Sequence, residues 1–121
     1  MKQKIPTETP VYLFLGFLES GKTKFIQETL EDKRFSSGEK TLLLVCEEGE
    51  EEYETIRFAD AENVELVVLD DKTKLTEAYL SGLQIQYGIE RVVVEYNGTW
   101  LLEDFFNAMP EGWMVFCFAR T

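Results

Sequence analysis

Histidine is absent from all 121 residues of the chain, and cysteine occurs only twice. Without histidine the chain has no Ser-His-Asp triad, no histidine general base and no histidine-ligated zinc. Cys46 and Cys117 form no CxxC pair, so the sequence contains neither a zinc ribbon nor a thioredoxin-type motif. We expect both thiols to be reduced core residues. Any chemistry must therefore use carboxylates, hydroxyls, lysine or the backbone.

Basic residues are also scarce, with 12 Lys and Arg against 23 Asp and Glu and a net charge of −11. A nucleic-acid partner needs a basic footprint, so this balance excludes one. Long apolar runs are missing too: the longest, residues 11–18, is far shorter than the roughly 20 residues that span a bilayer. Residues 1–10 contain two prolines and no apolar segment typical of an export signal. We expect a cytoplasmic protein that contacts neither membrane nor nucleic acid.

What the sequence does contain is a set of short apolar runs separated by longer polar or amphipathic stretches. Their continuous Val, Leu, Ile and Phe content is typical of strands buried on both faces of a parallel sheet. Together the segments predict an α/β domain with a mainly parallel sheet flanked by helices. We expect residues 1–10 to be a flexible lead-in and residues 11–121 to form one domain. The predicted strands are residues 11–15, 41–46, 64–69, 91–95 and 113–118.

Three amphipathic helices are predicted between these strands. The first covers residues 22–32. The second follows Asp70 or Asp71 as its cap and contains Leu75 and Leu83 at helical spacing. The third has Thr99 as its cap, and its apolar residues form one stripe ended by Pro110. The stripe consists of Leu101, Leu102, Phe105, Phe106 and Met109. Because no helix follows the last strand, we expect a truncated domain, either the N-terminal part of a longer protein or a reduced version of a larger domain.

Residues 16–23, with the sequence GFLESGKT, match the phosphate-binding pattern G-x-x-x-x-G-K-[ST] without deviation. The motif follows an apolar strand and precedes an amphipathic helix, as its mechanism requires. Loop N–H groups and the helix N-terminus attract phosphate oxygens, Lys22 bridges the β- and γ-phosphates, and the Thr23 hydroxyl ligates Mg²⁺. The other explanation is a glycine-rich turn with a solvated lysine. The predicted nucleotide-binding residues of the loop are Gly16, Glu19, Ser20, Gly21, Lys22 and Thr23.

Residues 11–23 resemble the opening strand and loop of CobW/HypB/UreG-like GTPases, in which CobW-type proteins read G-F-L-G-x-G-K-T. Residues 42–49 are similar to the second strand, which ends in N-E-x-G, and residues 92–98 are similar to a later strand that ends in E-x-x-G. The resemblance covers roughly residues 11–118. It implies a GTPase that helps to deliver metals such as cobalt, nickel or zinc to a client protein.

The resemblance also implies roles for individual residues. Glu47 falls in a nucleotide-responsive segment near the metal, Glu95 takes the acidic position near Mg²⁺, and Gly98 lies near the γ-phosphate. Glu19 replaces a glycine of the family loop, and the family's C-x-C-C metal motif is missing where residues 70–73 stand. The guanine-reading N-K-x-D element does not occur in the sequence, so no base contact separates GTP from ATP.

Two acidic features have both a structural and a functional explanation. Residues 47–54 contain six glutamates in eight positions, which indicates either a solvated loop or a switch segment that gathers a hard cation. Glu95 directly follows the apolar run of residues 92–94, so its carboxylate is predicted at the carboxyl edge of the sheet, where open α/β sheets bind ligands. There it holds an Mg²⁺-bound or attacking water, or it pairs with a structural partner.

These observations predict Mg²⁺-dependent binding and slow hydrolysis of a purine nucleoside triphosphate, GTP more than ATP, with Lys22 and Glu95 as the catalytic residues. Thr23, Glu47 and Glu95 are the predicted metal ligands. The alternative is a non-hydrolysing interaction module derived from the same fold, which would associate with a missing C-terminal domain or a second copy. A small-molecule kinase is a third option, because such kinases share the loop.

Overall fold

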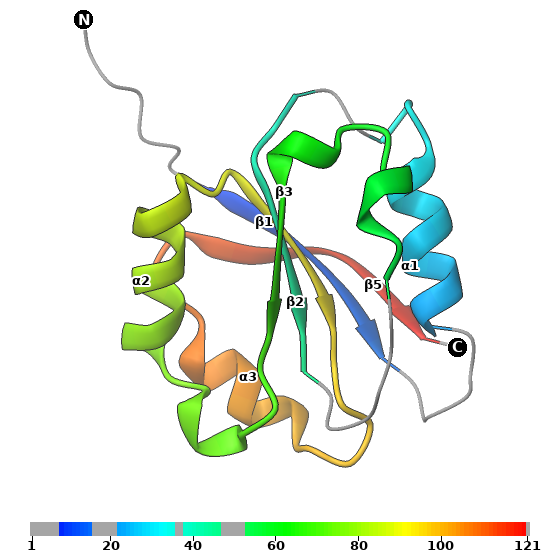
Figure 1. The fold of residues 1–121 in the computed structure, drawn as a ribbon. Coiled ribbons are helices and arrows are strands. Elements are labelled where there is room, and N and C mark those ends of the chain that lie inside the picture. The colour runs from blue at the N-terminus through cyan, green and yellow to red at the C-terminus, as the bar shows by residue number, and fades with distance from the viewer. Residues whose placement is uncertain (1–7, 16–21, 36–37, 47–52, 121) are drawn as a thin grey trace, which may run out of the picture.

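The computed structural model describes residues 8–15, 22–35, 38–46 and 53–120 (Figure 1). For Lys22 and residues 116–120 it describes the backbone alone. This part of the chain forms a five-stranded parallel sheet with α-helices on both faces, which confirms the predicted α/β class. The strands are β1 (Thr9–Leu15), β2 (Thr41–Val45), β3 (Val64–Val68), β4 (Arg91–Glu95) and β5 (Trp113–Arg120). The helices are α1 (Lys22–Glu31), α2 (Glu77–Tyr87) and α3 (Leu102–Ala108), with 3₁₀ turns η1 (Thr55–Arg57), η2 (Ala61–Asn63) and η3 (Lys72–Lys74).

The strand order is β3-β2-β4-β1-β5, and every neighbouring pair is parallel. From β1 the chain crosses over β4 to reach β2, whereas from β4 it crosses over β1 to reach β5. The two connections therefore leave neighbouring strands in opposite directions. Such a reversal opens a crevice at the carboxyl ends of the two strands, and open α/β sheets bind their ligands there.

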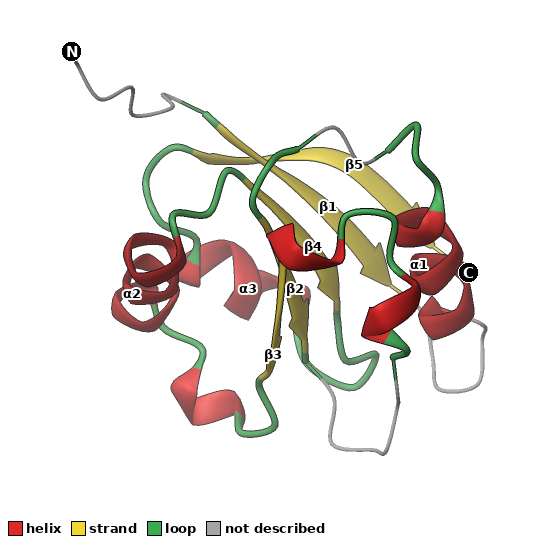
Figure 2. Ribbon diagram, turned by 45° about the horizontal axis from the view of Figure 1, so that its top comes forward, coloured by secondary structure: helices red, strands yellow, loops and turns green. Residues whose placement is uncertain are grey.

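The two faces of the sheet are covered by different helices (Figures 1 and 2). On one face, Ile26 and Leu30 of α1 pack against a cluster that includes Leu43 and Val93. On the other face, α2 and α3 pack against the alternate residues of the same strands. This arrangement follows from the reversal of the chain, because right-handed crossovers in opposite directions lie on opposite faces. The side chains of that second cluster include Leu42, Leu44, Val92, Val94, Leu80, Leu83 and Phe105.

The predicted cap of the second helix was wrong. The side chain of Asp71 accepts a hydrogen bond from the Thr73 N–H and so caps η3, a separate short turn. The helix α2 begins only after Leu75, because the Thr76 hydroxyl accepts a 3.1 Å hydrogen bond from the Tyr79 N–H. Capping oxygens occur at both positions, and the local backbone decides which one starts the α-helix.

The third helix also begins later than predicted. The Thr99 hydroxyl and N–H both donate to Asn97 Oδ1, so Thr99 belongs to the turn after β4 and the helix begins at Leu102. The predicted stripe is consequently split: Phe105 is fully buried, whereas Leu101 is 64% exposed and Phe106 is 44% exposed.

Strand β3 differs from the prediction of a strand buried on both faces. It is an edge strand that pairs only with β2, and its residues are all partly or largely exposed. Val68 is 56% exposed. The reason is the connection from β2 to β3, which contains short 3₁₀ turns rather than a covering α-helix in its described part. Strand β1 begins at Thr9, so it includes the last two residues of the predicted lead-in. It starts there because the Thr9 N–H donates to the Gly112 carbonyl, where the pairing with β5 begins.

Among the residues that the structure describes, no helix is both long enough and apolar enough to cross a bilayer.

Candidate functional site

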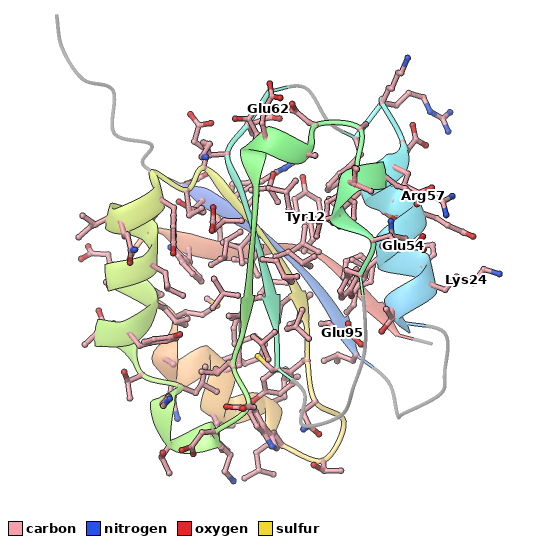
Figure 3. All side chains as sticks on the ribbon, viewed as in Figure 1. Tyr12, Lys24, Glu54, Arg57, Glu62 and Glu95 are labelled. Atoms are coloured by element: carbon pink, nitrogen blue, oxygen red, sulfur yellow. The ribbon has the colours of Figure 1, made fainter. Side chains whose placement is uncertain are left out.

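The carboxylate of Glu95 is the centre of the candidate site, and it lies at the carboxyl end of β4 (Figure 3). Its neighbours across the sheet are Phe14 of β1 and Val45 of β2. The Glu95 side chain is only 1% exposed. The prediction that Glu95 stands at this edge is confirmed, and the structure adds that the carboxylate is buried.

Thr23 donates a hydrogen bond from Oγ1 to Glu95 Oε2 over 2.7 Å. Thr23 is the last residue of the phosphate-binding motif and lies in the first turn of α1, and it is 72 positions from Glu95 in the sequence. The contact forms because β1 and β4 are neighbours, so the helix that follows β1 begins beside the end of β4. The structure thus brings together two of the three predicted metal ligands.

Tyr53 is a second partner of Glu95 that sequence reasoning missed. Its hydroxyl donates a hydrogen bond to Glu95 Oε1, so each carboxylate oxygen accepts from a different hydroxyl group. The only signal in the sequence was that Tyr53 interrupts the acidic run of residues 47–54. That pattern does not indicate a partner, because the contact joins two residues that are 42 positions apart in the sequence.

The segment around Tyr53 is held on α1 through Gln27. The side-chain amide of Gln27 donates to the Glu54 carbonyl over 3.1 Å and accepts from the Glu54 N–H over 3.0 Å. Arg57 forms ion pairs with Glu54 and with Glu31 of α1, at 2.8 and 3.3 Å. Figure 3 shows Glu54 and Arg57 beside α1. These contacts fix the backbone that follows Tyr53 against the helix that carries Thr23.

Further anchoring comes from Phe58, which is buried in the core cluster beneath α1. Its ring lies 6.4 Å from the ring of Tyr53, in a tilted arrangement. Aromatic pairs at such separations are favourable. The Tyr53 ring therefore packs against a fixed neighbour, while its hydroxyl reaches Glu95.

The charge of Glu95 is not balanced by any lysine or arginine side chain that the structure describes; the ion pairs in those regions involve other carboxylates. A buried carboxylate is costly unless it is paired, hydrogen-bonded or bound to a metal. Here two hydroxyl donors satisfy the oxygens, but the negative charge stays. A carboxylate beside a threonine hydroxyl is a pair of hard oxygen ligands, the kind that Mg²⁺ takes in proteins. Thr23 and Glu95 therefore fit Mg²⁺.

The turn that follows Glu95 is fixed by Tyr96 and Asn97. The Tyr96 hydroxyl donates to the Leu101 carbonyl over 2.6 Å, and burial raises the pKa of this phenol above its usual range. Asn97 closes the turn by accepting from Thr99. Gly98 lies exposed in this turn, three residues beyond Glu95, and none of the contacts in the described residues joins it to Thr23.

The remaining predicted residues cannot be placed in the site. Gly16, Glu19, Ser20, Gly21 and Glu47 lie outside the described residues, and Lys22 begins α1 with only its backbone described. Within the described ranges, no group of three or more carboxylate or cysteine side chains is arranged to hold a metal ion. The chain matches no family model, no curated protein and no solved structure.

Proposed function

We propose that this chain binds a purine nucleoside triphosphate together with Mg²⁺, GTP in preference to ATP, and hydrolyses it slowly. The observation that supports the proposal most is the hydrogen bond from Thr23 to Glu95, at the carboxyl edge between β1 and β4. It joins the last residue of the phosphate-binding motif to the acidic end of the neighbouring strand. The resemblance of roughly residues 11–118 to CobW/HypB/UreG-like GTPases favours GTP and extends the proposal to metal delivery.

In this proposal each residue has a distinct task. The N–H groups of the loop and the Lys22 ammonium bind the phosphates, and the Thr23 hydroxyl holds Mg²⁺. A hydroxyl has one proton and two lone pairs, so Thr23 can donate to Glu95 and ligate a cation at the same time. Glu95 accepts from water and orients it near Gly98. Bound Mg²⁺ supplies charge neutralisation at the phosphate oxygens, and the chain contributes positioning and electrostatics.

The first experiment is calorimetric binding of GTP and ATP, with Mg²⁺ and with EDTA, to the chain and to Thr23→Val. Valine keeps the β-branched shape and removes the hydroxyl, so we expect at least about a tenfold loss of Mg²⁺-dependent affinity and little change in EDTA. Thr29→Val is the matched control, because Thr29 lies on the same helix and its hydroxyl bonds only the Phe25 carbonyl among the described contacts. Equal Mg²⁺-dependent affinity in Thr23→Val and the native chain would contradict the proposed site.

Lys22→Ala tests the phosphate part of the same site. We expect it to abolish nucleotide binding and leave the fold intact, since Lys22 is the first residue of a helix whose packing residues lie further along. Phosphate release that requires Mg²⁺ and disappears in Lys22→Ala supports an enzyme.

The second candidate is a non-hydrolysing interaction module. It is favoured by large apolar side chains that stand in solvent, Ile56 at 88% exposure and Ile85 at 82%. Ile56 lies in η1 beside α1 and Ile85 lies in α2 on the opposite face, so they mark two separate exposed apolar points where a partner could bind, and not one patch. Association with a partner that neither nucleotide nor Lys22→Ala alters, together with no phosphate release, would favour the module over the enzyme.

A further inference from the structure

We propose that Tyr53 regulates the candidate site: its hydroxyl holds the Glu95 carboxylate while no nucleotide is bound, and it leaves Glu95 when Mg²⁺ and nucleotide bind. The proposal rests on the proposed function and deepens it. It is carried by the separate use of the two carboxylate oxygens, with Thr23 on Oε2 and Tyr53 on Oε1.

The two hydroxyls bond different oxygens of the carboxylate, and they come from different segments of the chain. Thr23 can keep its proton on Glu95 while its lone pairs bind a cation. Tyr53 takes up one acceptor site of Oε1, and a metal-bound water needs an acceptor site on the same buried carboxylate. Because Glu95 is 1% exposed, such a water can reach the carboxylate only if a side chain that covers it moves. The Tyr53 hydroxyl therefore competes with the hydrated cation for Glu95.

The packing indicates that Tyr53 moves more easily than Thr23. Thr23 lies on α1, whose Ile26 and Leu30 are fully buried in the core. Tyr53 lies outside any helix or strand, and its ring is only partly buried at the edge of the same cluster. Segments with few buried contacts open at lower free energy than packed helices. Displacing the tyrosine thus costs less than displacing the helix.

The contacts of Gln27 define how far the motion extends. Its amide pairs with both backbone groups of Glu54, and Phe58 is anchored in the core four residues further on. Residues from Glu54 onward can therefore stay in place while the Tyr53 side chain turns away. We infer a local rotation about a fixed Glu54 rather than detachment of the whole segment.

The test compares the native chain with Tyr53→Phe, which keeps the ring beside Phe58 and removes the hydroxyl that bonds Glu95. Binding of a non-hydrolysable GTP analogue is measured by calorimetry with Mg²⁺ and with EDTA. Hydrogen bonds to charged groups are among the stronger ones, so we expect about tenfold tighter binding with Mg²⁺ and no change in EDTA. Tyr87→Phe, in α2 on the opposite face, is the matched control and should bind like the native chain.

A second readout follows the tyrosine itself. In chain labelled with 3-fluorotyrosine, the ¹⁹F resonance that Tyr53→Phe removes belongs to Tyr53. We expect this resonance to shift when Mg²⁺ and the analogue are added together, and to stay in place when the analogue is added with EDTA.

Each outcome decides the inference. The inference is supported if Tyr53→Phe binds the analogue more tightly with Mg²⁺ than the native chain does. It is also supported if Tyr53→Phe binds the analogue and the native chain does not. Equal or weaker binding in Tyr53→Phe, with a native chain that binds, overturns the role of Tyr53 and leaves the proposed function standing. If neither protein binds the analogue, the proposed function fails and the inference fails with it.

Discussion

At the scale of single residues, Glu95 combines a buried negative charge with two uncharged donors, Thr23 and Tyr53. No lysine or arginine side chain in the described part of the chain pairs with Glu95. Burying a charge without such a pair reduces stability, and removing the charge is then often neutral or stabilising. Functional sites commonly keep groups of this kind at the expense of stability. We therefore expect a substitution at Glu95 to reduce nucleotide binding without reducing the stability of the fold.

Glu95→Gln tests this separation. Glutamine keeps the shape of the side chain and removes the charge, and the two hydroxyls can rotate to donate or accept. We expect the free energy of unfolding of the ligand-free chain to be equal to or higher than that of the native chain, and Mg²⁺-dependent nucleotide binding to be lost. Urea denaturation and calorimetry measure the two quantities.

Glu62→Gln serves as the control for Glu95→Gln, because Glu62 is exposed and should change neither quantity. A marked loss of stability in Glu95→Gln, with Mg²⁺-dependent binding retained, would mean that Glu95 serves the fold and not the site.

At the scale of elements, the sequence predicted the strands better than the beginnings of the helices. The strands are recognisable because buried parallel strands are continuous apolar runs, and β4 was predicted to the residue. The position of Glu95 at the carboxyl edge of the sheet followed from the rule that ligands gather where parallel strands end, whereas its hydrogen bond with Thr23 was not predicted. No such rule predicts the contact between Tyr53 and Glu95, because Tyr53 lies outside the strands and helices whose packing the apolar pattern indicates.

Helix starts were harder because several residues near each start can cap. Thr76, not Asp70 or Asp71, begins α2. The exposure of β3 was not predicted for a different reason. The apolar pattern of one strand does not indicate where that strand lies in the sheet, and β3 lies at the edge.

Thr76→Ala provides an energetic test of that helix start. It removes the hydroxyl that accepts from the Tyr79 N–H, so we expect the free energy of unfolding to fall by about 1 kcal/mol. Urea denaturation at neutral pH gives the value. Asp70→Ala is the comparison: Asp70 is exposed and was one of the two predicted caps, and its replacement should cost less than about 0.5 kcal/mol. A larger loss of stability in Asp70→Ala than in Thr76→Ala would mean that Asp70 caps the helix, as the sequence predicted.

At the scale of the whole molecule, the net charge of −11 acts on a chain of only 121 residues. Self-repulsion of like charges disfavours the compact state, and salt screens it. We expect the melting temperature of the ligand-free chain to rise by about a few degrees between 10 and 200 mM NaCl. Differential scanning fluorimetry across this range measures the shift. A melting temperature that is constant or falls with salt would show that the charges are already well compensated locally.

The order of the strands has a consequence for how the chain is made. Strands β1 and β2 are never neighbours: both pair with β4, which comes after them in the sequence. During synthesis, β1 and α1 therefore emerge without the strand that joins them to β2 and β3. Only when Arg91–Glu95 has left the ribosome can the earlier strands be joined in one sheet. The strand that carries Glu95 thus also joins the two earlier parts of the sheet, and the candidate site is assembled in the same step, before β5 is added beside β1.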